Sequence, residues 1–295
     1  TWSKARLVVT HGLKSICPSA AVYDRQTGRI HVLYNLFGWD YTRVPKGVRG
    51  GIGDLTCRQY VVTSDDEGHT WSKPCDISDM AGTHGAAMVV GSGEGIQLRY
   101  GKHKGRLIFA GGDFYKGKKV LCYYSDDHGS TWQRGAPVPT PQPMAMASET
   151  KVAELPDGSL LLNSRCYHED GSVHRLRTWA RSRNGGPTWT KLENDPALRT
   201  VSCNGSLIAV RHDAGEAGAV LLCSVPAGPK RTRGTVYASL DGGQTWPLSK
   251  VLVPEEFAYS TLVELADGRI GLFYEARGHK DICLVRFNLD TLLEP

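Results

Sequence analysis

The sequence lacks several features that would point to particular classes of protein. It has no run of 18 apolar residues, so no membrane-spanning helix is indicated. Helical periodicity is weak throughout, and no signal-peptide pattern follows Thr1. The net charge is only +5, and the basic residues are scattered rather than gathered in a stripe with interleaved aromatics. We therefore expect no membrane span and no nucleic-acid partner.

The cysteines also lack the spacing of a known site. All eight are dispersed and none forms a Cys-x-x-Cys pair, so zinc-site spacing is absent. Cys122, Cys223 and Cys283 lie in apolar, strand-like runs, where a thiol behaves as a small buried hydrophobe. We expect buried free thiols rather than disulfides, and neither a metal nor an organic cofactor.

One motif of the pattern Ser-x-Asp-x-Gly-x-Thr-Trp occurs four times. The Asp side chain accepts hydrogen bonds from the backbone two residues on, and the Gly supplies a positive φ, so each copy predicts a tight turn between two strands. The Thr-Trp pair predicts a strand start, with its indole packed beneath its own hairpin. The motif is thus a folding device rather than a catalytic one. Its copies are residues 64–71, 125–132, 182–189 (with Asn184 replacing the Asp) and 239–246.

The Thr-Trp pairs recur at a nearly fixed period. Counting Thr1-Trp2, successive spacings are 69, 61, 57 and 57 residues. A period of this size with strand-turn-strand content predicts a β-propeller rather than a helical solenoid. We expect an all-β fold in which residues 1–295 form a single domain. Five turn-plus-strand segments indicate five blade cycles of short strands: residues 27–33, 104–109, 157–162, 217–222 and 267–273.

The chain opens on Thr1-Trp2, which matches the end of a turn motif whose first half is not in the sequence. Because the spacing fits, we expect at least one hairpin ahead of Thr1, so that the first blade is incomplete here. Coincidence is the alternative, since Thr-Trp alone is only a dipeptide.

Two glycine-rich stretches interrupt the repeats. Residues 36–54 break the period, and loops of this length in compact domains are often functional, although an exposed insert is an equal alternative. Residues 91–100 superficially suggest a phosphate-binding loop, but no Gly-Lys-Ser/Thr follows. We expect those glycines where the backbone lies close to the central channel.

Polar residues near strand ends are the first candidates for a site, because strand ends in a propeller face the channel mouth. Glu149 precedes one strand and Arg165 ends the next, although a lone charge there is more often simply exposed. Asn204, in the same region of the following blade, is a further candidate for substrate binding. It also begins an Asn-Gly-Ser glycosylation motif, which is weak evidence by itself.

The turn repeats are similar to the Asp boxes of the sialidase (neuraminidase) superfamily, and the chain resembles bacterial-type exo-sialidases over essentially its full length. Asp boxes alone are unspecific, whereas Glu, Arg, Arg, Tyr and Glu in the family's order carry more weight. The resemblance implies a six-bladed propeller of four-stranded antiparallel blades, with its site at the channel mouth and sialylated glycans as partners. The similarity lies in residues 93–101, 124–129, 162–165, 241–247 and 259–262.

The resemblance also implies a role for each candidate residue. Tyr259 matches the catalytic tyrosine and Glu149 the glutamate paired with it. Arg165 and Arg231 match two arginines that grip the sialate carboxylate, with Arg233 a near competitor of Arg231. Glu275 matches the acid that orients the remaining arginine.

The chemistry explains these residue types. A sialoside carries a carboxylate on its anomeric carbon, which would repel a carboxylate nucleophile, and a neutral phenol avoids this repulsion. Free phenol has a pKa of about 10, so an adjacent carboxylate, here Glu149, must take its proton. Guanidinium groups bind a carboxylate through paired hydrogen bonds. We also expect Arg165 and Arg231 to lower the pKa of Tyr259.

The chain departs from the family's pattern in one respect. The family's first arginine, in an Arg-Ile-Pro-like motif, and its acid/base aspartate have no counterpart in these residues. We expect both ahead of Thr1, because Asp24 and Asp40 lie in the wrong blade context.

We therefore expect an exo-α-sialidase that releases terminal sialic acids with retention, through a tyrosyl-enzyme intermediate. One alternative is a non-catalytic, sialoside-binding or degenerate propeller. Another is a trans-sialidase or a glycosidase acting on a related nonulosonic acid. The cellular location is left open by the residues: a secreted or periplasmic protein is favoured, and a cytoplasmic one is the alternative.

Overall fold

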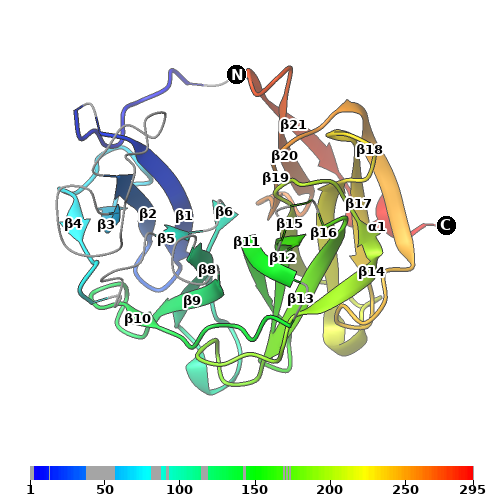
Figure 1. Cartoon of the computed structure of the whole chain (residues 1–295), viewed down its shortest axis with the longest axis horizontal. Coiled ribbons are helices and arrows are strands. Elements are labelled where there is room, and N and C mark those ends of the chain that lie inside the picture. The colour runs from blue at the N-terminus through cyan, green and yellow to red at the C-terminus, as the bar shows by residue number, and fades with distance from the viewer. Residues whose placement is uncertain are drawn as a thin grey trace.

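The computed structural model describes residues 3–12, 14–37, 57–80, 88–90, 93–113, 119–141, 144–168, 170, 172 and 174–294. They form mainly antiparallel sheets that follow one another in chain order around a central axis, from the blue N-terminal strands to the red C-terminal strands (Figure 1). This arrangement is an all-β propeller, as the repeat period predicted. In the described part of the chain no helix is long and apolar enough to cross a membrane.

The first two sheets share the glycine-rich stretch. β6 pairs in parallel with β1, whereas β5 and β7 pair with β8. The first sheet contains β1 (Ile16–Asp24), β2 (Arg29–Phe37), β3 (Cys57–Ser64), β4 (Cys75–Asp76) and β6 (Gly93–Glu94). The second contains β5 (Met88–Val90), β7 (Ile96–Gln97), β8 (Leu107–Asp113), β9 (Lys119–Ser125) and β10 (Gln133–Arg134).

The next two sheets are regular four-stranded blades, and the fifth has three described strands. The third sheet contains β11 (Met144–Glu154), β12 (Leu160–His168), β13 (Leu176–Ser182) and β14 (Glu193–Arg199). The fourth contains β15 (Ser206–Arg211), β16 (Ala219–Pro226), β17 (Thr232–Ser239) and β18 (Leu248–Glu256). The fifth contains β19 (Ser260–Glu264), β20 (Ile270–Ala276) and β21 (Asp281–Phe287), and the short helix α1 (Leu289–Leu293) follows it.

The expected blade count of six is corrected to five in the described residues. Each of the five turn-plus-strand segments found in the sequence enters the second long strand of a different sheet, namely β2, β8, β12, β16 and β20. The repeat count therefore matches the sheets, whereas the number implied by resemblance does not. The predictions for Thr1-Trp2 and for most of the 36–54 insert lie outside the described residues.

The repeated motif forms the predicted turn, but by a different hydrogen bond. Its glycines have positive φ, for example 81° at Gly68. Asp66 bonds to Thr70, four residues on rather than two: Oδ1 accepts from the Thr70 N at 2.8 Å and Oδ2 from its hydroxyl at 2.6 Å. The reason is that Ser64 Oγ already accepts from the amides of Asp66 and Gly68. Asp127, Asn184 and Asp241 bond to the corresponding threonines in the other copies.

The motif tryptophans pack between blades rather than only beneath their own hairpins. Trp132 is 1% exposed and lies edge-on to Phe109 of its own sheet and to His31 of the preceding one. The Trp246 indole N–H reaches back to Asp195 Oδ2 of the preceding sheet, at 2.8 Å. Burial of such large apolar surfaces therefore joins successive blades.

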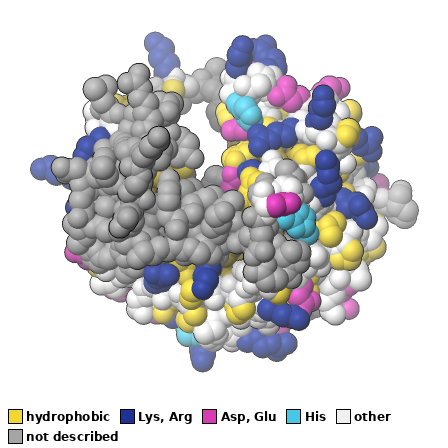
Figure 2. Space-filling view, viewed as in Figure 1, with side chains coloured by type: hydrophobic (Ala, Val, Ile, Leu, Met, Phe, Trp, Pro, Cys, Tyr) yellow, Lys and Arg dark blue, Asp and Glu magenta, His cyan; other side chains and the backbone are white. Residues whose placement is uncertain are grey.

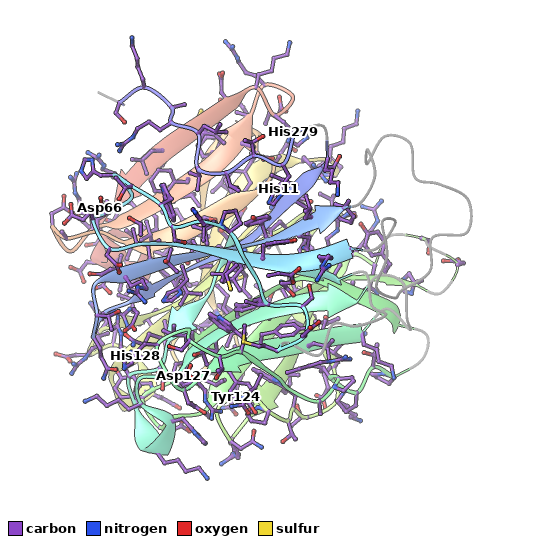
Figure 3. The ribbon with its side chains drawn as sticks, turned by 90° about the vertical axis from the view of Figure 1, so that its left-hand side faces the viewer. His11, Asp66, Tyr124, Asp127, His128 and His279 are labelled. Atoms are coloured by element: carbon purple, nitrogen blue, oxygen red, sulfur yellow. The ribbon has the colours of Figure 1, made fainter. Side chains whose placement is uncertain are left out.

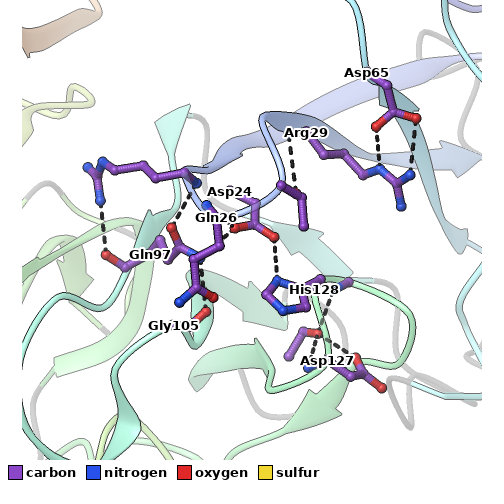
Figure 4. Close-up of polar contacts among 12 residues, drawn as sticks. Asp24, Gln26, Arg29, Asp65, Gln97, Gly105, Asp127 and His128 are labelled. Atoms are coloured by element: carbon purple, nitrogen blue, oxygen red, sulfur yellow. Dashed lines mark hydrogen bonds and ion pairs between the residues drawn. The ribbon is translucent and has the colours of Figure 1, made fainter.

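A polar network joins the first two blades (Figure 4). Asp24, at the end of β1, is fully buried. Its carboxylate accepts from the Gln97 amide at 2.6 Å and meets His128 Nδ1, in the second turn motif, at 2.7 Å. The inter-blade contact therefore depends on a carboxylate whose hydrogen bonds come from both neighbouring segments.

Gly93 and Gly95 of the glycine-rich stretch lie where a side chain has no room. A Cβ built on Gly95 would stand 2.3 Å from Val22 Cγ2, and one on Gly93 would stand 1.4 Å from Lys151 Nζ. The prediction against disulfides is confirmed, since none of the eight cysteines forms one, and five of them are buried.

Candidate functional site

The predicted site residues and the turn motifs lie at opposite ends of the blades. Within a blade the first and third strands run in the same direction, because each pairs antiparallel with the second. The turn motifs follow the third strands, whereas Tyr259 directly precedes the first strand β19. In Figure 3, Asp66, Asp127 and His128 of the turn motifs lie to the left, and His279 lies away from them.

A β-bulge sets the position of Glu149. β11 pairs Ala147 with Cys166 but Thr150 with Ser164, so Ser148 and Glu149 together oppose the single residue Arg165. Bulges of this kind re-aim a side chain and are common beside active sites. The two charged candidates in this blade are therefore brought together across the irregularity.

Tyr259, Glu149 and Arg165 form one hydrogen-bonded cluster. The Tyr259 hydroxyl donates to Glu149 Oε1. Arg165 Nη1 donates to Glu149 Oε2 at 2.7 Å and contacts the Tyr259 oxygen at 3.3 Å. The side chains of Arg165 and Glu149 are only 13% and 15% exposed, so their ion pair is largely shielded from water.

The pKa of Tyr259 is raised overall, although Arg165 acts on it as expected. Burial is the main cause that raises the pKa of this phenol, and the negative charge of Glu149 raises it further. Arg165 lowers the pKa of Tyr259, as expected of a nearby cation, but does not outweigh these two causes. The phenol is thus held protonated, with a carboxylate as its hydrogen-bond acceptor.

Backbone hydrogen bonds hold the segments of the last two sheets against each other. Phe257 N donates to Arg231 O at 2.9 Å, Ala258 N to Glu275 O at 3.0 Å, and Glu275 N to Tyr259 O at 2.9 Å. Phe257 is fully buried, and its ring fills the space beside Gly234, where a Cβ would come within 2.2 Å. Tyr259 is therefore fixed by the main chain on both sides.

Of the two competing arginines, Arg231 lies in the cluster. Its guanidinium carbon stands 5.4 Å from the centroid of the Tyr259 ring, and its Nη2 donates to Ser202 O at 3.0 Å. Arg233 is exposed, with φ of 57°. The geometry therefore favours Arg231 over Arg233.

The other two predicted residues have different surroundings. Glu275 Oε2 contacts His279 Nδ1 at 2.6 Å. Asn204 is 3% exposed, so it is not presented as a surface glycosylation acceptor. Its role in substrate binding stays a prediction.

Three residues near the cluster were not singled out from the sequence. Arg165 Nη2 donates to Ser202 Oγ, which in turn donates to Tyr167 Oη at 2.8 Å. The Arg165 guanidinium also lies 4.9 Å from the centroid of the Tyr167 ring. Tyr167 follows Arg165 by two residues in a strand, which is a signal that it shares a face with it. Ser202 and His279 lie outside strands and give no such signal.

Buried cations lie behind the cluster. Arg177 is fully buried and donates to Asn163 Oδ1 at 2.6 Å and to Cys203 O at 3.2 Å. Lys151 is also buried, and its pKa is lowered to about 8, chiefly by burial. Glu94 interacts with Lys151, and burial raises the pKa of this carboxyl to about 7. Burial therefore disfavours the charged forms of both Lys151 and Glu94 in this region.

The molecule also has an open space at its centre (Figure 2), with basic and acidic side chains at its edge. One pocket in the described part of the chain has a volume of about 550 Å³ and is separate from the cluster. Its walls include Val152 and Glu154 of β11 and Ile208 of β15. None of the six predicted site residues lines it.

The fold and the site together define a class: a β-propeller in which a tyrosine–carboxylate pair and two arginines converge at the face opposite its turn motifs. Residues 1–272 match the family model described as BNR repeat-like domain. A sialidase of Micromonospora viridifaciens is 35% identical over 293 residues, covering 93% of this chain and 43% of that protein. Sialidase-2 of Cricetulus griseus is 29% identical, covering 95% of this chain and 76% of that protein.

Solved structures agree with this assignment. A Hadza microbial sialidase superposes with a TM-score of 0.80 and 28% identity, covering 99% of this chain and 57% of that one. An intramolecular trans-sialidase of Ruminococcus gnavus, with a TM-score of 0.75 and 20% identity, shares the fold. The chain belongs to the sialidase superfamily of BNR-repeat propellers. It spans less than half the length of the first curated relatives it matches.

Proposed function

We propose that the protein containing this chain is an exo-α-sialidase that hydrolyses terminal sialic acids of glycoconjugates with retention, through a tyrosyl-enzyme intermediate. The observation that carries the proposal is the hydrogen bond from the Tyr259 hydroxyl to the Glu149 carboxylate, beside Arg165. The sialidase relatives support the same substrate class.

In the proposed reaction, Glu149 accepts the phenolic proton as the Tyr259 oxygen attacks the anomeric carbon. The attack breaks the glycosidic bond, and the departing oxygen takes a proton from solvent. Water then attacks the same carbon, the bond to Tyr259 breaks, and the phenolate takes back its proton from Glu149, so that two inversions give retention. Because the pKa of Tyr259 in the protein is raised, Glu149 must take the phenolic proton during the attack rather than before it. Arg165 and Arg231 bind the sugar carboxylate through charge-assisted hydrogen bonds.

The test is hydrolysis of a fluorogenic α-sialoside by the full-length gene product, with Tyr259→Phe as the variant. Phe keeps the ring but has no oxygen nucleophile, so we expect kcat to fall by more than about 1,000-fold. Turnover close to that of the unmodified protein would exclude Tyr259 as the nucleophile. If the unmodified protein binds sialic acid but shows no turnover, the result would support the sialoside-binding alternative.

A second candidate is intramolecular trans-sialylation. A relative named anhydrosialidase, from Macrobdella decora, is 31% identical over 228 residues, covering 72% of this chain and 28% of that protein. Identification of the released sugar by mass spectrometry separates the two candidates. Free sialic acid supports hydrolysis, whereas an anhydro sugar supports the transferase.

A further inference from the structure

The hairpin between β20 and β21 has an unusual backbone. Arg277, Gly278 and His279 have φ of 50°, 63° and 65° in succession. The left-handed region is unfavourable for residues with a Cβ, and such strain often accompanies a functional position. Gly278 N donates to Glu256 Oε1 at 2.7 Å, which anchors the turn to β18.

The side chains of Arg277 and His279, the two non-glycine residues of this turn with positive φ, make different contacts. Arg277 is 74% exposed and pairs with Asp281 of its own hairpin at 2.8 Å. His279 instead contacts Glu275 Oε2 through Nδ1 at 2.6 Å and Arg231 Nη1 through Nε2 at 3.4 Å. The backbone conformation of His279 thus brings its ring to the predicted carboxylate-binding arginine.

Only one form of the imidazole satisfies both contacts. Nδ1 must carry the proton to donate to Glu275, and Nε2 must be unprotonated to accept from Arg231. Arg231 then has acceptors at both ends of its guanidinium, because its Nη2 donates to Ser202 O at 3.0 Å. A relay therefore runs from Glu275 through His279 to Arg231, which lies over the Tyr259 ring.

We propose that His279 is a positioning residue, which holds Arg231 in the orientation that binds the sialoside carboxylate. The proposal rests on the proposed function, since it assigns a task to one part of that site. The carboxylate is present in the bound substrate and in the transition state alike. Loss of His279 therefore weakens binding more than it slows the chemical step.

The test compares three variants of the full-length protein: His279→Ala, His279→Gln and Arg277→Ala. The measurements are kcat and KM on a fluorogenic sialoside and the dissociation constant of free sialic acid by calorimetry. We expect His279→Ala to raise both KM and the dissociation constant by about fivefold to tenfold, with kcat within about twofold. Gln offers one donor and one acceptor, so it should restore part of the affinity.

Arg277→Ala is the matched control, because it removes the other strained side chain from the same turn without touching Arg231. It should leave KM unchanged. An equal rise in KM for Arg277→Ala would assign the effect to the turn as a whole and overturn the proposal. Unchanged KM and unchanged affinity for sialic acid in His279→Ala would also overturn the proposal. If His279→Ala does not fold, the same comparison is made with His279→Gln, which should still bind less tightly than the unmodified protein.

A double variant with Arg231→Ala provides a second readout. If His279 acts through Arg231, adding His279→Ala to Arg231→Ala should weaken binding no further. Full additivity would contradict the relay. An unmodified protein without turnover or sialic acid binding would instead contradict the proposed function, and with it this inference.

Discussion

Glu149 has a different partner on each of its carboxylate oxygens: Tyr259 on one and Arg165 on the other. The Arg165 pair orients the carboxylate, and the other oxygen remains the acceptor for the phenolic proton. A glutamine at this position could keep the orientation but could not take the proton. The two tasks of the side chain can thus be separated by one substitution.

We predict that Glu149→Gln lowers kcat by about 100-fold to 10,000-fold, the usual range for loss of a general base, and changes KM much less. Steady-state kinetics on a fluorogenic sialoside measures both. Glu154→Gln, on the same strand, is a suitable control, because this carboxylate accepts only from the Arg99 and Tyr100 amides among the contacts described. A larger effect on KM than on kcat would argue against the base role.

At the residue scale, the candidate site residues came from the resemblance to a known family, and their roles stay predictions. Tyr259, Glu149 and Arg165 were named in advance, and the structure brings them together. His279 and Ser202 were missed because their contacts depend on how loops of two sheets meet. The lowering of the Tyr259 pKa by Arg165 was predicted, but the overall rise was not, because the sequence does not reveal how deeply the phenol is buried.

The turn motif is the element whose role is easiest to isolate. Asp127 accepts from the Thr131 N at 2.8 Å, the Thr131 hydroxyl at 2.6 Å and the Ser125 hydroxyl at 2.8 Å. It lies at the face away from Tyr259. Its contribution should therefore be to stability and not to catalysis.

We predict that Asp127→Ala lowers the free energy of unfolding by about 1–2 kcal/mol, as expected for lost hydrogen bonds to a charged group. Urea denaturation measures this change, and kcat should not alter. Asp65→Ala, in the first copy of the motif, is the control, because this carboxylate pairs with Arg29 at an exposed position and should matter less. An equal loss of unfolding free energy in the two variants would mean that the hydrogen bonds within the motif stabilise the fold no more than an exposed ion pair does.

Sequence reasoning predicted these elements well because their signals are local. The turn glycines and the five turn-plus-strand segments each depend on residues a few positions apart. The choice of Thr70 rather than a nearer amide as the partner of Asp66 was missed. It depends on Ser64 occupying those amides first, which is a competition that a pattern does not show.

At the scale of the whole molecule, stability depends on how successive blades are joined. Asp24 links the first two blades through Gln97 and His128. Burial raises the pKa of Asp24, but its hydrogen bonds to Gln26, His128, Thr27 and Gln97 together outweigh this, so the pKa lies below its ordinary value of 3.8. A carboxyl with a depressed pKa stabilises the fold above its ordinary pKa, and this contribution is lost as the pH falls through the depressed value.

We predict that Asp24→Asn lowers the melting temperature at pH 7 and reduces the loss of stability on going from about pH 4 to lower pH. Melting curves of the two proteins across this range provide the measurement. If both proteins lost stability in parallel at low pH, the titration of Asp24 would not contribute. The joint between blades was not predicted from the sequence, because Asp24 and Gln97 are 73 residues apart.

The bulge in β11 makes the length of that strand part of the site. Deleting Ser148 would leave one residue opposite Arg165 and restore a regular ladder. The residues on either side would keep their faces, because Ala147 and Thr150 already pair with Cys166 and Ser164, but Glu149 would lose the orientation that the bulge gives it. A scan of substitutions would not reveal this requirement, because no substitution changes the number of residues in the strand. Insertions and deletions in β11 therefore test whether the site depends on the number of residues in this strand, which substitutions of its side chains do not test.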